Sequence, residues 1–202
     1  MCYSAESSAG TFLFVAAIAA FLFYRGGKVR YAVAIILLFI ALMQLVEFLI
    51  WSNIRCGSEN RFITYFIPIL LFLQPIIVLG SLLYFDVGLL PSAIYKALLI
   101  VWIVAMPLFL EWMKEGWGKC TLIGPNGHLE WPYTKSKTHI SQDLYNLTLG
   151  AGIATLNTPW YGIFYIVMAS MSYFYTQQIY GHSWSSIWCN FVNALAVGAV
   201  FI

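Results

Sequence analysis

The chain has 202 residues, of which 61% are hydrophobic and 9% are charged, and its mean hydropathy is +0.81. A soluble globular domain carries about 25% charged residues, and a chain this apolar would leave a large apolar surface in water. The formal net charge of +2 comes without a basic run, which argues against a nucleic-acid partner. The composition therefore predicts an integral membrane protein whose main partner is the lipid bilayer.

Apolar stretches of the length that crosses a bilayer as a helix, roughly 20 residues, recur along the chain. We predict an all-α fold, a seven-transmembrane-helix bundle that forms one domain over residues 1–202. The expected spans are about 5–24, 29–51, 62–84, 92–110, 141–157, 160–176 and 185–202. The fifth span is the least apolar, and a re-entrant or surface helix is the alternative for it.

The longest loop, residues 111–140, connects the fourth and fifth predicted spans. It contains two short β-prone runs on either side of Asn126-Gly127, a pattern that is typical of a β-hairpin. Long loops in compact domains are usually functional. We therefore expect a hairpin that either caps the bundle or contributes to a site.

The distribution of basic residues gives an orientation. Arg25, Lys28 and Arg30 crowd the first loop, whereas the N-terminal tail has no Lys or Arg. Positive residues favour the cytoplasmic side, so we expect a non-cytoplasmic N-terminus and, with seven spans, a cytoplasmic C-terminus. Four lysines in the 111–140 loop argue for the opposite orientation, but they are spread over a longer segment.

Seven spans place alternate loops on one side, and all four cysteines and all three histidines then fall on the non-cytoplasmic face. Cys56 and Cys120 both lie in loops of this face. Because disulfides form in oxidising compartments, we expect a bridge between them that holds the hairpin to the second loop. Two free thiols or two metal ligands are the alternatives.

The same face carries a candidate metal site. The α-amine of Met1 and the thiolate of Cys2 can chelate a soft or borderline ion, and imidazole from His128, or alternatively from His182, would complete the set. Glu47 lies inside a predicted span, where a carboxylate is costly and often functional, and it is the expected fourth ligand or an acceptor behind the ligands. Copper is favoured and zinc is the alternative. A buried apolar role for Cys2 and a structural hydrogen bond for Glu47 remain open, because no ligand pair has a diagnostic spacing.

The leading functional hypothesis is therefore a metal-binding membrane protein with its site on the non-cytoplasmic face. The second is a non-metal structural or lipid- or small-ligand-binding protein, such as a viral envelope component, and an enzyme is the third. A retinal cofactor is excluded because residues 185–202 contain no lysine for a Schiff base. Self-association into a homo-oligomer is left open.

Four short motifs carry a resemblance that runs along the chain. They are Met1-Cys2-Tyr3-Ser4-Ala5-Glu6, Cys56-Gly57-Ser58-Glu59-Asn60, Phe72-Leu73-Gln74-Pro75 and Gly127-His128-Leu129-Glu130-Trp131. They are similar to a family of uncharacterised membrane proteins from bacteria and large DNA viruses that begin Met-Cys-aromatic-Ser. The resemblance implies the same multi-span architecture and directs attention to Cys2, Cys56 and His128. The segment Glu130-Trp131-Pro132 departs from the family pattern.

Overall fold

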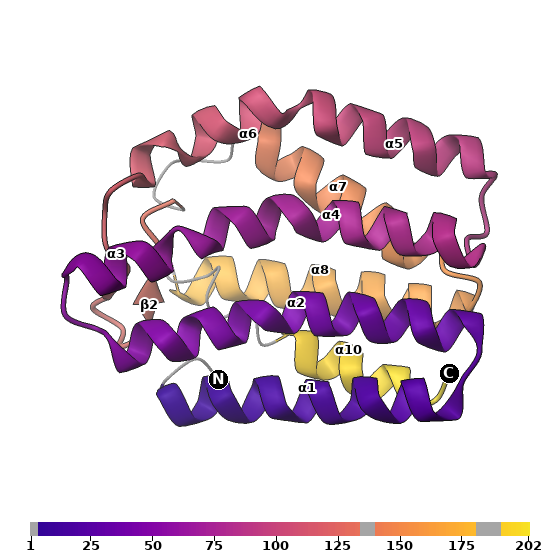
Figure 1. The fold of residues 1–202 in the computed structure, drawn as a ribbon, viewed down its shortest axis with the longest axis horizontal. Helices are drawn as coiled ribbons and strands as arrows, with labels where there is room; N and C mark the ends of the chain where they lie inside the picture. The colour runs from indigo at the N-terminus through magenta and orange to yellow at the C-terminus, as the bar shows by residue number, and fades with distance from the viewer. Residues whose placement is uncertain (1–3, 134–139, 181–190) are drawn as a thin grey trace.

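A computed structural model of the chain describes residues 4–133, 140–180 and 191–202. This part is mostly helical and contains one small antiparallel sheet. Its elements are α1 (Ala5–Arg25), α2 (Lys28–Ser52), α3 (Ser58–Thr64), α4 (Phe66–Phe85), α5 (Ser92–Val104), α6 (Met106–Met113), η1 (Lys114–Gly116), β1 (Leu122–Ile123), β2 (Leu129–Glu130), α7 (Ile140–Ala154), α8 (Pro159–Tyr180) and α10 (Phe191–Ala199). The helices run back and forth along the long axis of the molecule (Figure 1).

The helices occur where the sequence predicts spans, but only some of them are long and apolar enough to cross a membrane. Within the described residues these are α1, α2 and the stretch Ser58–Phe85, which comprises α3 and α4. The pair α5 and α6 bends by 45° at its break and would make a fourth span if the two helices cross together. Helices α7, α8 and α10 occupy the three remaining predicted ranges without meeting this test of length and hydropathy.

Among the described residues, helices α1 and α2 share the most extensive contact of any helix pair, and their sequence explains it. The turn between them consists of Gly26 and Gly27, whose φ angles of 70° and 102° suit glycine. Fully buried alanines, among them Ala19 on α1 and Ala34 on α2, line the interior of the bundle. Small side chains let helix backbones approach closely. In lipid the hydrophobic effect does not drive helices together, so this close packing is what stabilises their association.

Helix α4 lies at the centre of the bundle and packs against α2, α5 and α7. Two of its polar groups bind neighbouring helices. Gln74 accepts a hydrogen bond from the Tyr145 hydroxyl of α7, and the Phe72 carbonyl accepts one from the Trp102 indole of α5 at 2.9 Å. These bonds join three helices in a region where water cannot compete.

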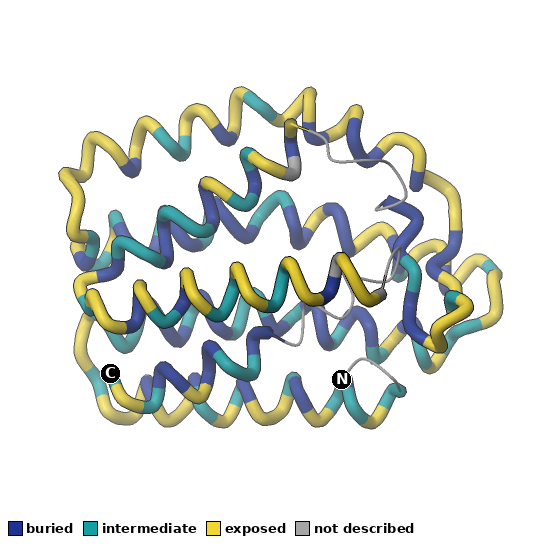
Figure 2. Tube along the Cα trace, turned by 180° about the vertical axis from the view of Figure 1, so that it is seen from behind, coloured by how far each residue is buried: buried dark blue, intermediate teal, exposed yellow. Residues whose placement is uncertain are grey.

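The outward faces of the helices are apolar. Figure 2 shows buried positions along the inner faces and exposed positions along the outer ones. Large exposed side chains include Leu13 (65%), Ile100 (61%), Val104 (72%) and Ile163 (64%). Apolar surface on this scale is unstable in water and is suited to lipid, so the structure has the surface of a membrane protein.

The predicted hairpin is present. Strands β1 and β2 pair antiparallel, with Leu122 opposite Glu130 and Ile123 opposite Leu129. Gly127 adopts a φ of 78° in the turn, and the Gly124 amide donates to the His128 carbonyl at 2.7 Å. The turn chemistry around Asn126-Gly127 therefore produces the expected structure.

The two ends of the bundle differ in composition, and we call them the capped end and the basic end. The capped end comprises the beginning of α1, the end of α2, the 53–57 loop, α3, the end of α6 and the hairpin. The basic end comprises the α1–α2 turn, the α4–α5 and α7–α8 links and the end of α10. These ends lie on the left and right of Figure 1, respectively.

Candidate functional site

The capped end brings together the segments that the sequence analysis expects on one face. The beginning of α1, the loop after α2 and the hairpin all lie there, although they are far apart in the chain (Figure 1). The back-and-forth course of the helices produces this arrangement.

Cys56 and Cys120 meet at this end. Their sulfur atoms are 1.98 Å apart and their Cα atoms 5.5 Å apart, over a sequence separation of 64 residues. Both distances are those of a disulfide. The pair connects the loop after α2 to the segment that leads into β1, which is the connection that the sequence analysis expects.

A buried polar network lies beside the cysteine pair. Asn60 and Thr64 on α3 and Thr121, next to Cys120, are all fully buried. The Thr121 amide donates to Asn60 Oδ1 at 3.1 Å, and Asn60 Nδ2 donates to the Thr121 carbonyl at 3.1 Å. The Thr64 and Thr121 hydroxyls are 3.1 Å apart. The side chain of Asn60 thus binds the backbone of Thr121 as a neighbouring β-strand would.

This network was not predicted from the sequence. Two features of the sequence could have indicated it. Asn60 and Thr64 are one helical turn apart and follow Cys56 closely, and Thr121 directly follows the other cysteine. Polar residues beside a crosslink are well placed to satisfy the backbone that the crosslink buries.

Glu47 lies in the last third of α2, toward the capped end, and its side chain is fully buried. Gln44, one turn earlier on the same helix, is also fully buried, and both residues interact with other groups of the protein. A buried carboxylate requires compensation by hydrogen bonds, a cation or a proton. Its burial inside a helix of membrane-spanning length makes Glu47 a candidate functional residue of the capped end.

His128 lies in the hairpin directly before β2, and it is 2% exposed. Its backbone is fixed by the hairpin, since its amide donates to Asn126 Oδ1 at 3.3 Å and its carbonyl accepts from Gly124. Trp131 and Tyr133, each 2% exposed, follow it in the chain. The imidazole is therefore buried in the protein and not exposed to solvent, and the residue also interacts with other groups.

The predicted metal ligands are only partly described. Met1 and Cys2 lie outside the described residues, and so do His139, His182 and Cys189. Glu47 and His128 are both buried toward the capped end. Among the residues that the structure describes, no group of three or more His, Cys, Asp or Glu side chains could hold a metal ion.

An apolar cavity of about 430 Å³ lies between α4 and α6. Phe72, Met106, Phe109, Met113 and Trp117 are among the side chains that line it. Its volume falls in the range of small-molecule pockets, roughly 300–1,000 Å³. Its lining suits an aliphatic or aromatic group.

No known protein family, curated protein or solved structure matches this chain. The resemblance described in the sequence analysis therefore stays a prediction.

Proposed function

We propose that the chain is a seven-span membrane protein whose capped end is non-cytoplasmic and binds a transition-metal ion, with copper favoured over zinc. The observation that carries the proposal is the burial of Glu47 and His128 toward the same end of the bundle, with 0% and 2% exposure. Carboxylates and imidazoles inside a membrane protein are costly and often functional, and both can act as metal ligands. A metal ion would use both.

The orientation is supported by two independent features. The cysteine pair at the capped end has disulfide geometry, and such bonds persist outside the reducing cytoplasm. The tight turn at the basic end carries Arg25, Lys28 and Arg30 next to membrane-length helices, which is typical of the cytoplasmic side. All seven predicted ranges contain helix in the described residues, and this supports the proposed number of spans.

The proposed ligand set is the Met1 amine, the Cys2 thiolate and the His128 imidazole, with Glu47 as a fourth ligand or as an acceptor that orients a ligand. Sulfur and nitrogen donors select copper or zinc, whereas magnesium and calcium prefer oxygen. The cysteine crosslink and the Asn60 network would hold the hairpin, and with it His128, in a constant position. Preorganisation of this kind raises metal affinity.

The metal proposal is tested by elemental analysis of full-length protein purified without an immobilised-metal column. We expect nearly stoichiometric copper or zinc in the wild type and a loss of most of it in Cys2→Ser, Glu47→Gln and His128→Gln. Glu59→Gln, an exposed acid at the same end, is the matched control and should keep its metal. Wild-type protein that binds neither metal at micromolar free concentration would refute the proposal.

The orientation has its own test. Glycosylation acceptors inserted in the 111–140 loop should be modified in a eukaryotic membrane system, whereas acceptors in the α1–α2 turn should not. The reverse pattern would place the cysteine pair in the cytoplasm and remove the main support for the proposed orientation.

The apolar cavity between α4 and α6 favours a second function, binding of a lipid chain or another apolar ligand without metal. Filling the cavity by Met106→Trp should then abolish binding of a fluorescent fatty acid and leave metal content unchanged. Ile100→Trp, on the exposed face of α5, is the control. Equal binding by both variants would argue against this second function.

A further inference from the structure

The basic end contains a pocket that neither the proposed metal site nor the apolar cavity uses. It has a volume of about 290 Å³, opens to the surface and lies where the α1–α2 turn meets the α7–α8 link and the end of the described chain. The residues that line it are Gly27, Lys28, Val29, Arg30, Thr158 and Ile202.

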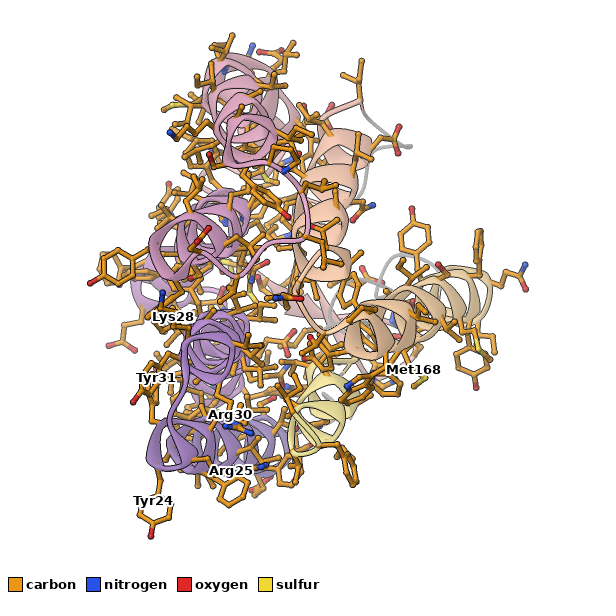
Figure 3. The ribbon with its side chains drawn as sticks, turned by 90° about the vertical axis from the view of Figure 1, so that its right-hand side faces the viewer. Tyr24, Arg25, Lys28, Arg30, Tyr31 and Met168 are labelled. Atoms are coloured by element: carbon orange, nitrogen blue, oxygen red, sulfur yellow. A yellow bond between two sulfur atoms is a disulfide. The ribbon has the colours of Figure 1, made fainter. Side chains whose placement is uncertain are left out.

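Two arginines shape this end by binding backbone oxygens. Arg25 Nη1 donates to the Val200 carbonyl at 3.0 Å, and Arg30 Nη2 donates to the Ile202 oxygen at 2.8 Å. Figure 3 shows both side chains extending from α1 and α2 toward α10. Arg30 Nη1 also donates to the Gly26 carbonyl at 3.0 Å. The guanidinium of Arg30 is therefore fixed at the pocket wall, and the Ile202 oxygen in the pocket is already paired with it.

Basic side chains outnumber acidic ones at this end. The ion pair among the described residues joins Lys114 to Glu111 at the opposite, capped end. Lys28 is exposed at the rim of the pocket. Asp86 is the one acidic side chain in the segments of the basic end, against Arg25, Lys28, Arg30 and Lys96. An anion that enters this pocket thus meets a positive potential.

Hydrogen-bond donors converge on the same place. Lys28, Val29 and Arg30 form the first turn of α2, whose amides have no partner inside the helix, and the N-cap Gly27 supplies no side chain to bind them. Arg30 Nε and Thr158 Oγ1 are also buried without a hydrogen-bond partner among the described residues. A group with several oxygen atoms could satisfy these donors together, with the Thr158 hydroxyl turning toward it.

We propose that this pocket binds a phosphate group, supplied either by the headgroup of an anionic phospholipid or by free phosphate. A phosphate matches an open helix N-terminus, a guanidinium and an ammonium group. Basic pockets between membrane helices are known to take lipid headgroups. This site lies at the opposite end from the proposed metal site and does not depend on it.

The surroundings of the pocket suit the level of lipid headgroups. Tyr24 and Tyr84, at the ends of α1 and α4, are 90% and 84% exposed, and Tyr24 projects away from the bundle in Figure 3. Exposed tyrosines at helix ends mark the membrane interface. A phospholipid in the adjoining leaflet would therefore have its phosphate at the depth of the pocket.

The test uses full-length protein in a non-ionic detergent, titrated with phosphatidylglycerol or phosphatidylcholine and followed by native mass spectrometry. We expect tighter binding of phosphatidylglycerol by the wild type. Lys28→Gln should weaken this binding about fivefold. Thr158→Val, which removes the hydroxyl without changing the charge, should weaken it about fivefold to tenfold. Thermal unfolding without lipid verifies that both variants are folded.

Lys96→Gln is the matched control, because it removes a positive charge at the same end but outside the pocket. It should change phosphatidylglycerol binding less than twofold. A parallel titration with inorganic phosphate distinguishes the two sources: protection from thermal unfolding with the same variant pattern assigns the site to free phosphate. Equal losses in all three variants, or no preference for phosphatidylglycerol together with no effect of inorganic phosphate, would overturn the proposal.

Discussion

The two ends of the bundle secure their loops by different means. At the capped end, the cysteine pair and the side-chain network of Asn60, Thr64 and Thr121 hold the hairpin. At the basic end, the links pair through their backbones: the Leu89 amide donates to the Thr155 carbonyl and the Asn157 amide to the Val87 carbonyl, both at 2.8 Å. The capped end buries its polar side chains, whereas the basic end keeps its charges near the surface.

This difference relates to what each end could bind. A metal ion requires ligands that are held in fixed positions, and a crosslinked cap with buried side chains meets this requirement. A phosphate group is recognised by charge and by several donors, and it tolerates some motion of a lysine at the rim of its pocket. If the comparison is correct, changes at the capped end should act mainly on stability and geometry, and charge changes at the basic end should act mainly on anion binding.

The largest effect is expected from removal of the cysteine pair. In the double variant Cys56→Ser/Cys120→Ser, loss of a crosslink across 64 residues should lower the free energy of unfolding by up to about 4 kcal/mol. Unfolding in detergent would measure this, with Glu59→Gln, at an exposed position of the same end, as the control. In the wild type, alkylation without reductant should label neither Cys56 nor Cys120. Full labelling of both would contradict the disulfide.

Asn60→Ala tests the polar part of the cap. The substitution leaves the Thr121 amide and carbonyl buried with fewer partners, which should cost about 2–3 kcal/mol. Asn53→Ala is the matched control, because Asn53 Nδ2 donates at an exposed position to the Leu49 carbonyl within the same helix, and it should cost less than about 0.5 kcal/mol. Similar thermal unfolding of both variants would mean that the network does not stabilise the cap.

Gly162→Ala tests the basic end, where close backbone packing replaces crosslinks. A Cβ at this position would lie 2.2 Å from the Ala154 carbonyl oxygen, a backbone atom that cannot move without shifting α7. We expect a loss of about 1–3 kcal/mol. Gly80→Ala is the control, since its Cβ would meet nothing within 4 Å, and it should be neutral or stabilise by up to about 1 kcal/mol. Thermal unfolding of the two variants tests whether α7 and α8 pack this closely.

The sequence predicted the helix ranges well because each depends on a local apolar stretch. Turn signals were equally local, as at Asn126-Gly127 and Gly26-Gly27. The disulfide partners followed from loop order, since Cys56 and Cys120 belong to loops that an antiparallel bundle brings to one end. The bend between α5 and α6 was not predicted, because nothing near Ala105 other than Pro107 indicates it.

Features that depend on three-dimensional packing could not be predicted from local sequence patterns. The Asn60 network joins residues about 60 positions apart, and Arg25 and Arg30 bind carbonyls at the end of the chain. The sequence analysis used these arginines only for orientation. Burial of Glu47 was expected from its place in a span, whereas burial of His128 required the folded hairpin.

Tyr133→Phe should have the smallest effect, and it sharpens the description of the cap. Burial, with a smaller contribution from the nearby Tyr65, raises the pKa of Tyr133 to about 12. The unfolded chain ionises near pH 10, so above that pH the unfolded state loses this proton first and stability falls until about pH 12. The hydroxyl has no hydrogen-bond partner among the described residues. Its removal should therefore be neutral or slightly stabilising at pH 7, by up to about 1 kcal/mol.

The pH dependence of thermal unfolding tests whether the buried Tyr133 hydroxyl keeps its proton in the folded state. Tyr133→Phe should lose less stability than the wild type between pH 10 and pH 12, because phenylalanine has no proton to release in either state. Tyr24→Phe, whose ring is 90% exposed, is the control and should follow the wild type. A Tyr133→Phe variant that is clearly less stable than the wild type at pH 7 would show that the hydroxyl has a partner. The interior of the cap would then be more polar than the described surroundings of Tyr133 indicate.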